Sequence, residues 1–146
     1  ALVAPSTLAS PRRNVVGWDS SRLAMLTAVL EARCGVPLSG RDIFLNVAGG
    51  LKIAETAADL AVAAALISSV TGRPAPPRCV FFGEVALSAE LRQVAQADAR
   101  LKEAAKLGFD MAVMPRPRKK LAAPTGLSLG QPATLAELIE IMGGVS

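Results

Sequence analysis

Apolar side chains at helical spacing predict a first helix directly behind Asp19, which is a favoured N-cap residue. The spacing runs to a stop at Gly35. The apolar positions of this helix are Leu23, Leu26, Val29 and Leu30. A second helix is predicted over about residues 56 to 70, ending before Gly72. That segment is apolar almost all round, so we expect it to be central and covered by other elements.

Two shorter helices are predicted nearer the C-terminus. The first covers about residues 98 to 107 and is closed by Gly108. The second, TLAELIEIM, begins at Thr134, which forms a capping box with Glu137.

Runs of β-branched and apolar residues between these helices predict strands. They are DIFLNV (42–47), CVFF (79–82) running into GEVAL, and MAVMP (111–115). Strands alternate with helices, so the predicted class is α/β, with a mixed sheet packed against helices. Residues 1–18 contain two prolines and are interpreted as an extended lead-in.

Composition restricts the chemistry that the chain can perform. Of 146 residues, 51% are hydrophobic and 19% charged, which excludes a disordered chain. With no His, Ser-His and Cys-His dyads and nearly all zinc sites are excluded. Cys34 and Cys79 are interpreted as buried, reduced thiols of a cytosolic protein, and no function is assigned to either. No membrane span and no signal peptide are predicted.

The net charge is +4, and the basic residues are mostly arginine. Guanidinium groups match phosphate and carboxylate geometry, so an anionic partner is one interpretation. A solvated basic surface is the other. With one Trp, four Phe and no Tyr, a platform for stacking single-stranded bases is not expected.

The stretch GEVALSAELRQVAQADARLKEAAKLGF, together with DIFLNVAGG and AETAADLAVAAALISS upstream, resembles the proteolytic domain of Lon-type ATP-dependent peptidases. The resemblance covers about residues 15 to 115 and includes the family's glycine–glutamate strand at Gly83 and Glu84. It implies a Lon proteolytic-domain-like fold, of the kind also found in domain 2 of ribosomal protein S5. It also implies that the nucleophilic serine of that family falls on Ala57 and the general-base lysine on Arg100.

Both members of the catalytic dyad are therefore missing. Alanine offers no nucleophile, and arginine stays protonated, so it cannot accept a proton from a hydroxyl group. Thr56 and Lys102 are the nearest substitutes. Lys102 lies two positions beyond Arg100, about 200° around the helix, and is expected to face away. We expect no catalytic residue and no metal site in this chain.

Within Lon-like domains, the chain is most similar to the carboxy-terminal domain of the bacterial RadA (Sms) family of DNA-repair and recombination proteins. The match rests on ALVAPS, PRRNVVGWDSSRLAMLTAVLEARCG, DIFLNVAGGLKIAETAADLAVAAALISS, FFGEVALSAELRQV and RLKEAAKLGF. Thr56 departs from the proline that is common in that family, and no function is attached to it.

The RadA resemblance implies a longer parent protein with a four-cysteine zinc finger and a RecA-like, DNA-dependent ATPase core. Residues 1–18 would lead in from that core, and residues 15–146 would form a single Lon-like domain. ATP, Mg²⁺ and zinc would belong to the parent protein alone. The expected partners are DNA, further copies in a homo-hexameric ring that promotes branch migration, and the RecA recombinase, in the bacterial cytoplasm at the nucleoid.

The primary hypothesis for DNA contact is that four basic residues form one phosphate-binding patch: Arg13, Arg22, Lys52 and Arg92. The alternative is scattered solvated charges, with Arg100 held in an internal ion pair. Arg22 occupies the third position of the first helix, where a cation opposes the helix dipole, so a role elsewhere is indicated. An ion pair with Asp19 is the alternative. The secondary candidates are Arg12 and the basic run of Arg116, Arg118, Lys119 and Lys120.

Three functions remain open from the sequence. The first is a non-catalytic domain that contacts DNA and assembles a ring in recombinational repair. The second is a structural oligomerisation scaffold that contacts neighbouring subunits and no DNA. The third is a peptidase with an unorthodox Ser or Thr nucleophile.

Overall fold

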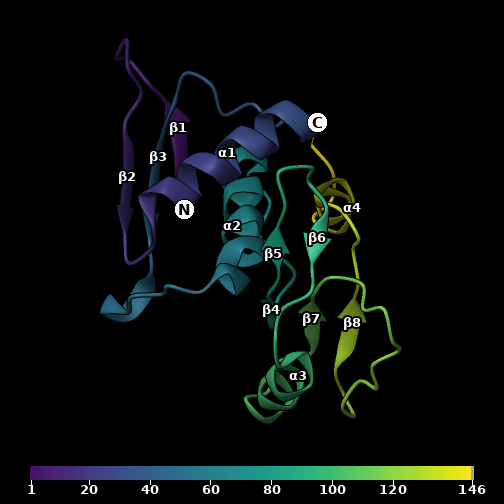
Figure 1. The fold of residues 1–146 in the computed structure, drawn as a ribbon. Coiled ribbons are helices and arrows are strands. Elements are labelled where there is room, and N and C mark those ends of the chain that lie inside the picture. Colours follow the sequence, from purple (N-terminus) through teal and green to yellow (C-terminus); the bar gives the residue numbers. More distant parts are fainter. Residues whose placement is uncertain (146) are drawn as a thin grey trace.

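The computed structural model describes residues 1–145, which form four α-helices and three small sheets (Figure 1). The α/β class is therefore confirmed. The first sheet has the order β1-β3-β2, with β1 at Leu2–Pro5, β2 at Arg13–Val16 and β3 at Arg41–Asn46. In it, β1 runs antiparallel to β3 and β2 runs parallel to β3. The expected mixed sheet exists, but it holds only these three strands.

Residues 1–18, expected as a lead-in, are extended and also pair into this first sheet. Val3 of β1 is buried in the main core, and its N–H donates to Ser69 Oγ at 2.8 Å. Short strands around Pro5 and Pro11 lack an alternating pattern long enough to be recognised in the sequence.

The second sheet has the order β4-β7-β8 and is parallel throughout. Its strands are β4 at Cys79–Phe81, β7 at Met111–Val113 and β8 at Ser128–Gly130. A two-stranded antiparallel pair joins β5 at Glu84–Val85 to β6 at Leu91–Arg92. The sequence did not predict β6 or β8, because neither lies in an apolar run, whereas the equally short β4 and β7 lie in the runs CVFF and MAVMP.

The four helices are α1 at Ser20–Cys34, α2 at Asp59–Thr71, α3 at Ala97–Lys106 and α4 at Leu135–Ile141. A 3₁₀ turn at Ala48–Gly50 follows β3, and another at Thr56–Ala58 precedes α2. The predicted caps of α1 are confirmed: the Asp19 side chain accepts from the N–H groups of Ser21 and Arg22, and Gly35 is left-handed. The second helix was predicted to start at residue 56, but the 3₁₀ turn occupies its first positions.

The capping box before α4 differs in one bond from the predicted pattern. Thr134 Oγ1 accepts from the Glu137 N–H, as expected, but the Glu137 carboxylate accepts from the N–H of Ala133 at 2.6 Å. The reciprocal bond thus closes one residue before the cap, and the start of α4 is still satisfied.

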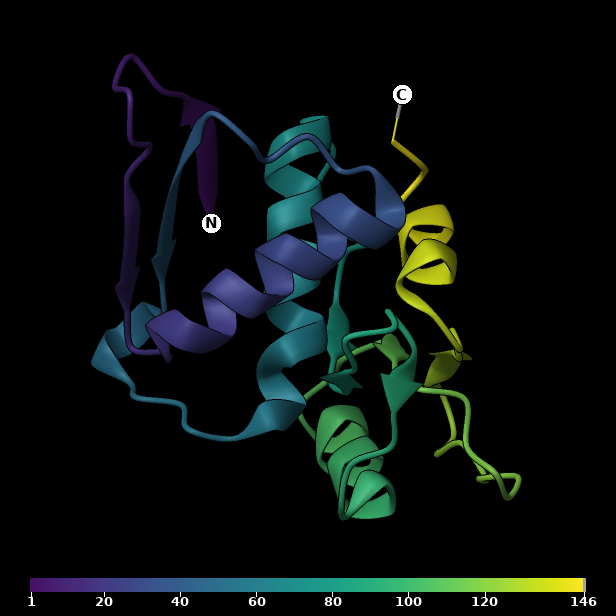
Figure 2. The ribbon, with the colours of Figure 1, turned by 45° about the horizontal axis from the view of Figure 1, so that its top comes forward.

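Helix α2 is central, as its all-round apolar pattern predicted. It contacts β1 of the first sheet and β4 of the second, and α1 and α4 also pack on it (Figures 1 and 2). A smaller core holds α3 against the second sheet; its buried members are Phe82, Leu101, Ala104, Ala112, Met114 and Leu127. In residues 1–145 no helix is long and apolar enough to cross a membrane.

A buried ion pair connects α1 to the start of α2. The Asp59 side chain is 0% exposed and accepts from Arg22 Nε at 2.8 Å, from a second Arg22 nitrogen, and from the Val85 N–H at 3.0 Å. The sequence left Asp19 as the alternative partner of Arg22. That alternative is wrong, because the Asp19 carboxylate caps the helix and Arg22 reaches Asp59 instead.

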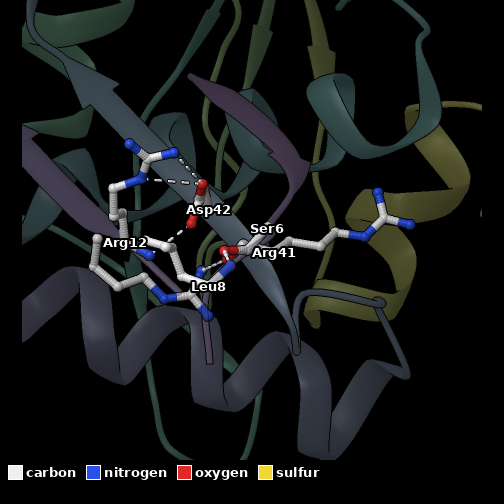
Figure 3. Close-up of polar contacts among 6 residues, drawn as sticks. Ser6, Leu8, Arg12, Arg41 and Asp42 are labelled. Carbon is white, nitrogen blue, oxygen red and sulfur yellow. Dashed lines mark hydrogen bonds and ion pairs between the residues drawn. The ribbon is translucent and has the colours of Figure 1, made fainter. Parts of the chain in front are cut away.

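A second carboxylate fixes the connection between β1 and β2. Asp42 is buried and accepts from the Arg12 backbone N–H at 2.6 Å and from Arg12 Nε and Nη2 (Figure 3). The backbone hydrogen bond from Arg12 is the main cause that holds the pKa of Asp42 below its ordinary value. Figure 3 shows that the Arg41 side chain points away from this cluster.

Replacing Arg22 by Met is expected to lower the free energy of unfolding by about 3–5 kcal/mol, because it leaves the Asp59 charge buried without its ionic partner. Lys102→Met is the matched control. It breaks the exposed Lys102–Asp98 pair and should cost less than about 1 kcal/mol. Urea unfolding followed by circular dichroism measures both. Equal losses for the two variants would show that the Asp59 pair has no special role in stability.

Candidate functional site

A hollow of about 360 Å³ lies between the start of α2, strand β4 and helix α3. Most of its lining is apolar. The lining residues are Ile53, Glu55, Ala57, Ala58, Ala61, Val80, Phe81, Phe82, Arg100, Glu103, Ala104, Leu107 and Phe109. The two positions that the sequence assigned to the missing dyad, Ala57 and Arg100, therefore face the same hollow, although 42 residues that form α2, β4, β5 and β6 separate them.

Ala57 and Arg100 cannot perform nucleophilic chemistry in this hollow. Ala57 is buried in the 3₁₀ turn and presents only a methyl group. Arg100 donates to the two carboxylate oxygens of Glu55 at 3.2 and 3.0 Å, and its guanidinium lies 5.8 Å from the centre of the Phe82 ring. The arrangement holds a permanent cation where a serine–lysine dyad requires a neutral amine.

The Glu55–Arg100 pair favours the charged form of both groups. The hydrogen bond from Arg100 lowers the pKa of Glu55, and the same bond raises the pKa of Arg100. The expected internal ion pair of Arg100 is thus present. The sequence did not identify Glu55 or Phe82 as part of the site, because their partner lies far along the chain and no local motif connects them.

The two substitutes considered from the sequence do not form a dyad. Lys102 is absent from the lining of the hollow, its side chain is 71% exposed, and it pairs with Asp98 at 3.1 Å. This agrees with the 200° offset predicted from helical geometry. Thr56 begins the 3₁₀ turn beside Ala57 but is also absent from the lining.

Gly83 fixes the turn that carries Ala57. The Gly83 N–H donates to the Ala57 carbonyl at 2.8 Å, and the Gly83 carbonyl accepts from the Leu60 N–H at 3.1 Å. A Cβ at this position would lie 2.7 Å from the Pro115 ring, closer than packed carbon atoms approach. The glycine of the glycine–glutamate strand is therefore required by close packing at the site.

The four primary DNA-contact candidates do not share one environment. Arg22 is 24% exposed and uses its guanidinium on Asp59. Arg13 donates to the backbone carbonyls of Arg41 and Leu38, at the start of β2. Lys52 lies beyond the other end of β2, next to Ile53, whose N–H donates to Gly17. The structure thus places Arg13 and Lys52 at opposite ends of one strand.

Arg92 lies beside the segment that carries the basic run 116–120. It pairs with Glu84 in the β5–β6 register, and the next residue, Gln93, donates to the Arg116 carbonyl at 3.3 Å. Arg116 and Lys120 line a hollow of about 570 Å³ with Gln131 of the loop behind β8. We name the set of Arg92, Arg116, Arg118, Lys119 and Lys120 the basic loop surface. The sequence predicted the basic run 116–120 as a secondary contact but not its association with Arg92, because Gln93 and Arg116 are 23 residues apart.

Several charged candidates are already neutralised in the fold. Six of the sixteen basic residues are in ion pairs: Arg12, Arg22, Arg78, Arg100, Lys102 and Arg116. The other ten, all within residues 1–145, have no carboxylate within 4.0 Å. Over the same described residues, no group of three or more Cys, Asp and Glu side chains is arranged to hold a metal ion.

A comparison with known protein families matches the segment that contains all the lining residues of this hollow. Residues 19–118 match a family model described as subunit ChlI of Mg-chelatase. The chain belongs to this family. The matched segment begins at the N-cap of α1 and extends past β7, so it includes both Ala57 and Arg100. It is nearly the segment, residues 15 to 115, that carries the resemblance to Lon-type domains.

Curated relatives of this ChlI-family chain are DNA repair proteins. It is 55% identical over 139 residues to DNA repair protein RadA of Brucella abortus, covering 95% of this chain and 30% of the relative. For RadA of Pseudomonas aeruginosa the identity is 50% over 129 residues, with 88% and 28% covered. For RadA of Synechocystis it is 51% over 116 residues, with 80% and 23% covered. The similarity to RadA proteins is confirmed, and the chain spans less than a third of their length.

Removing the Arg100 guanidinium should raise the pKa of Glu55 toward its ordinary value, because the hydrogen bond that stabilises the carboxylate is lost. Carbon-detected NMR titration of Arg100→Gln measures this change. In the native chain Glu55 should stay ionised to lower pH, and any stability from the pair is present above the ordinary pKa and lost as the pH falls through the lowered value. Arg116→Gln serves as the control and should leave Glu55 unchanged. An unshifted Glu55 in Arg100→Gln would contradict the pair.

Proposed function

We propose that this chain is a non-catalytic, Lon-like module that contacts DNA during recombinational DNA repair. The observation that carries the proposal is the surplus of basic side chains: ten have no carboxylate partner, in a chain of net charge +4. Such side chains are available for phosphate. The RadA names of the relatives support a role in DNA repair.

A Lon proteolytic-domain-like fold is supported by the geometry around the hollow. Ala57 and Arg100 face one cavity, as aligned dyad positions must, and Gly83 locks the Ala57 turn by two backbone hydrogen bonds. We propose a single Lon-like domain over residues 15–146. The pairing of β1 and β2 with β3 draws residues 1–18 into the same body.

The proposed lack of peptidase activity is supported by the methyl group of Ala57 and the permanent charge of Arg100, and we expect no covalent labelling of the chain by a fluorophosphonate probe at pH 8. Mass spectrometry of the intact protein measures the adduct, with an active serine peptidase as the positive control. Labelling that disappears in Thr56→Ala would instead support the unorthodox nucleophile.

The proposed DNA contact is the basic loop surface, with Arg13 and Lys52 as separate contacts near opposite ends of β2. Arg22 remains a candidate for DNA contact, although its ion pair with Asp59 neutralises much of its charge. Arg12 is likewise less available for phosphate, because its guanidinium is paired with Asp42. Within residues 1–145, the basic loop surface makes one ion pair, between Arg116 and Glu137 at 3.5 Å.

The triple variant Arg92→Gln, Arg118→Gln, Lys119→Gln should reduce DNA affinity and flatten its salt dependence. Each lost phosphate contact changes the slope of log affinity against log salt by about 0.9. Fluorescence anisotropy with a labelled duplex, over about 50–200 mM NaCl, measures the slope.

The charge-matched control is Arg33→Gln, Lys102→Gln, Lys106→Gln, which removes three exposed cations from α1 and α3. It should leave the slope near that of the native chain. Equal flattening by both triple variants would refute a localised surface and leave only a general effect of net charge.

The parent-level activities are part of the proposal. In a longer RadA-type protein, a DNA-dependent ATPase core would use ATP and Mg²⁺, a zinc finger would hold zinc, and a homo-hexameric ring would promote branch migration with RecA in the cytoplasm at the nucleoid. The present chain would hold none of these cofactors, and its contribution would be DNA contact and support of the ring.

A structural scaffold without DNA contact is the second candidate, and one observation favours it. On the outer face of the first sheet, Leu2 is 56% and Val16 62% exposed, and Phe44 lies beside Leu2 in the β1–β3 register. Exposed apolar residues on a sheet face are typical of protein interfaces. In the DNA experiment above, no binding at 50 mM salt together with concentration-dependent self-association would favour this candidate.

A further inference from the structure

The hollow beside Arg100 continues along helix α2 into a second one. The second hollow has a volume of about 330 Å³ and lies toward the N-terminal end of β1. Ala61 and Phe81 line both hollows. The two hollows therefore adjoin at these residues, and together we name them the α2–β4 groove.

The floor of this groove is made of small side chains from one face of α2. Ala58, Ala61, Ala65 and Ser68 follow at spacings of three and four residues, which places them on one stripe. The stripe is unlike the rest of α2, whose Leu60, Leu66 and Ile67 are fully buried. The small residues leave room above the helix for a chain to lie along it.

One wall of the groove is an open strand edge. In the second sheet β4 pairs with β7 alone. The Phe82 N–H donates to Val113 in β7, so by the alternation of a parallel ladder the backbone groups of Phe81 face the opposite edge. An open edge of this kind recognises an extended peptide backbone, while pockets beside it select side chains.

The charged side chains of the groove all lie in its first hollow, and their charge is opposite in sign to that of the whole molecule. They are Glu55, Glu103 and Arg100, which sum to −1 in a chain of net charge +4. Arg100 is paired with Glu55, which is 57% exposed, and no cation is paired with Glu103. The groove therefore disfavours phosphate and matches a Lys or Arg side chain in the ligand.

From these observations we propose that the α2–β4 groove binds an extended segment of a protein partner. The segment adds to the edge of β4, inserts an apolar side chain above Ala61 and Phe81, and places a neighbouring Lys or Arg beside Glu103 and Glu55. The binding is non-covalent and uses no group of the missing dyad. It is independent of the DNA contact proposed above, which uses other residues.

The test uses a fluorescein-labelled heptapeptide, acetylated and amidated, of sequence Thr-Val-Lys-Leu-Lys-Val-Thr. A second peptide replaces both Lys by Glu, and a third keeps the Lys residues but is N-methylated at the central Leu. Fluorescence anisotropy at 150 mM NaCl measures the three affinities. The Lys peptide should bind at least about tenfold more tightly than either other peptide, because one lacks the matching charge and the other an edge hydrogen bond.

Two variants of the protein locate the site. Ala61→Leu fills the shared centre of the groove and should weaken the Lys peptide about tenfold or more. The matched control is Ala28→Leu, at an exposed alanine of α1, which should bind like the native chain. Glu103→Lys, also at an exposed position, should weaken the Lys peptide and strengthen the Glu peptide.

Other results would overturn the proposal. Equal affinity for the Lys and Glu peptides, or native affinity in Ala61→Leu, would show that the peptide does not occupy the groove. Self-association in sedimentation that Ala61→Leu abolishes would make a second copy of the chain the occupant. Displacement of the peptide by a 20-mer duplex in native protein but not in the Arg92, Arg118, Lys119 variant would mean that the peptide binds the DNA surface.

Discussion

Asp59 places a carboxylate at the centre of the fold, out of reach of water, and three hydrogen-bond donors compensate for its charge. Two donors come from Arg22 on α1 and one from the backbone of Val85 on β5. A buried charge without such partners would cost several kcal/mol, so the start of α2 is fixed relative to both elements. Ala57 lies two residues earlier, and its turn is tied to Gly83. The position of the hollow therefore depends on this carboxylate.

The same interaction changes how the basic surface is understood. Arg22 opposes the dipole of α1, and the sequence connected that placement with phosphate. In the fold, the buried carboxylate of Asp59 explains the placement, since an arginine one turn into the helix reaches it from α1. Cations that are paired internally stabilise the domain, and those left without partners remain available for DNA. The distinction separates Arg22 from Arg92, although the sequence predicted both as DNA contacts.

The hollow and the basic loop surface have different chemistry. Around the hollow, Arg100 is held by Glu55 and Phe82, and Glu103 leaves the lining slightly acidic. The basic loop surface lies around β6 and the loop behind β7, where Gln93 joins two segments by one hydrogen bond. The two proposed contacts, of a peptide with the apolar, weakly acidic groove and of DNA with the basic loop surface, therefore use different residues.

Local structure was largely predictable where the residues that determine it lie within a few positions of one another in the sequence. The Asp19 cap, the left-handed Gly35 and the Thr134 cap each depend on neighbours within a few residues. Strands β1 and β2 were interpreted as a lead-in, because their pairing partner β3 lies about 30 residues beyond β2 and about 40 beyond β1. Strands β6 and β8 were missed because neither lies in an apolar run. The relation of Ala57 to Arg100 was inferred from a family resemblance and not from any local pattern.

By itself, the sequence determined what this protein lacks: a histidine, a nucleophile at Ala57 and a neutral base at Arg100. Those properties follow from the identity of single residues, whatever their surroundings. Only the tertiary structure decided which charges are neutralised and where a groove opens. The partners Arg22 and Asp59 are 37 residues apart, and Arg100 and Glu55 are 45 apart. Charge and shape at a surface depend on contacts across such distances, and the fold alone brings those residues together.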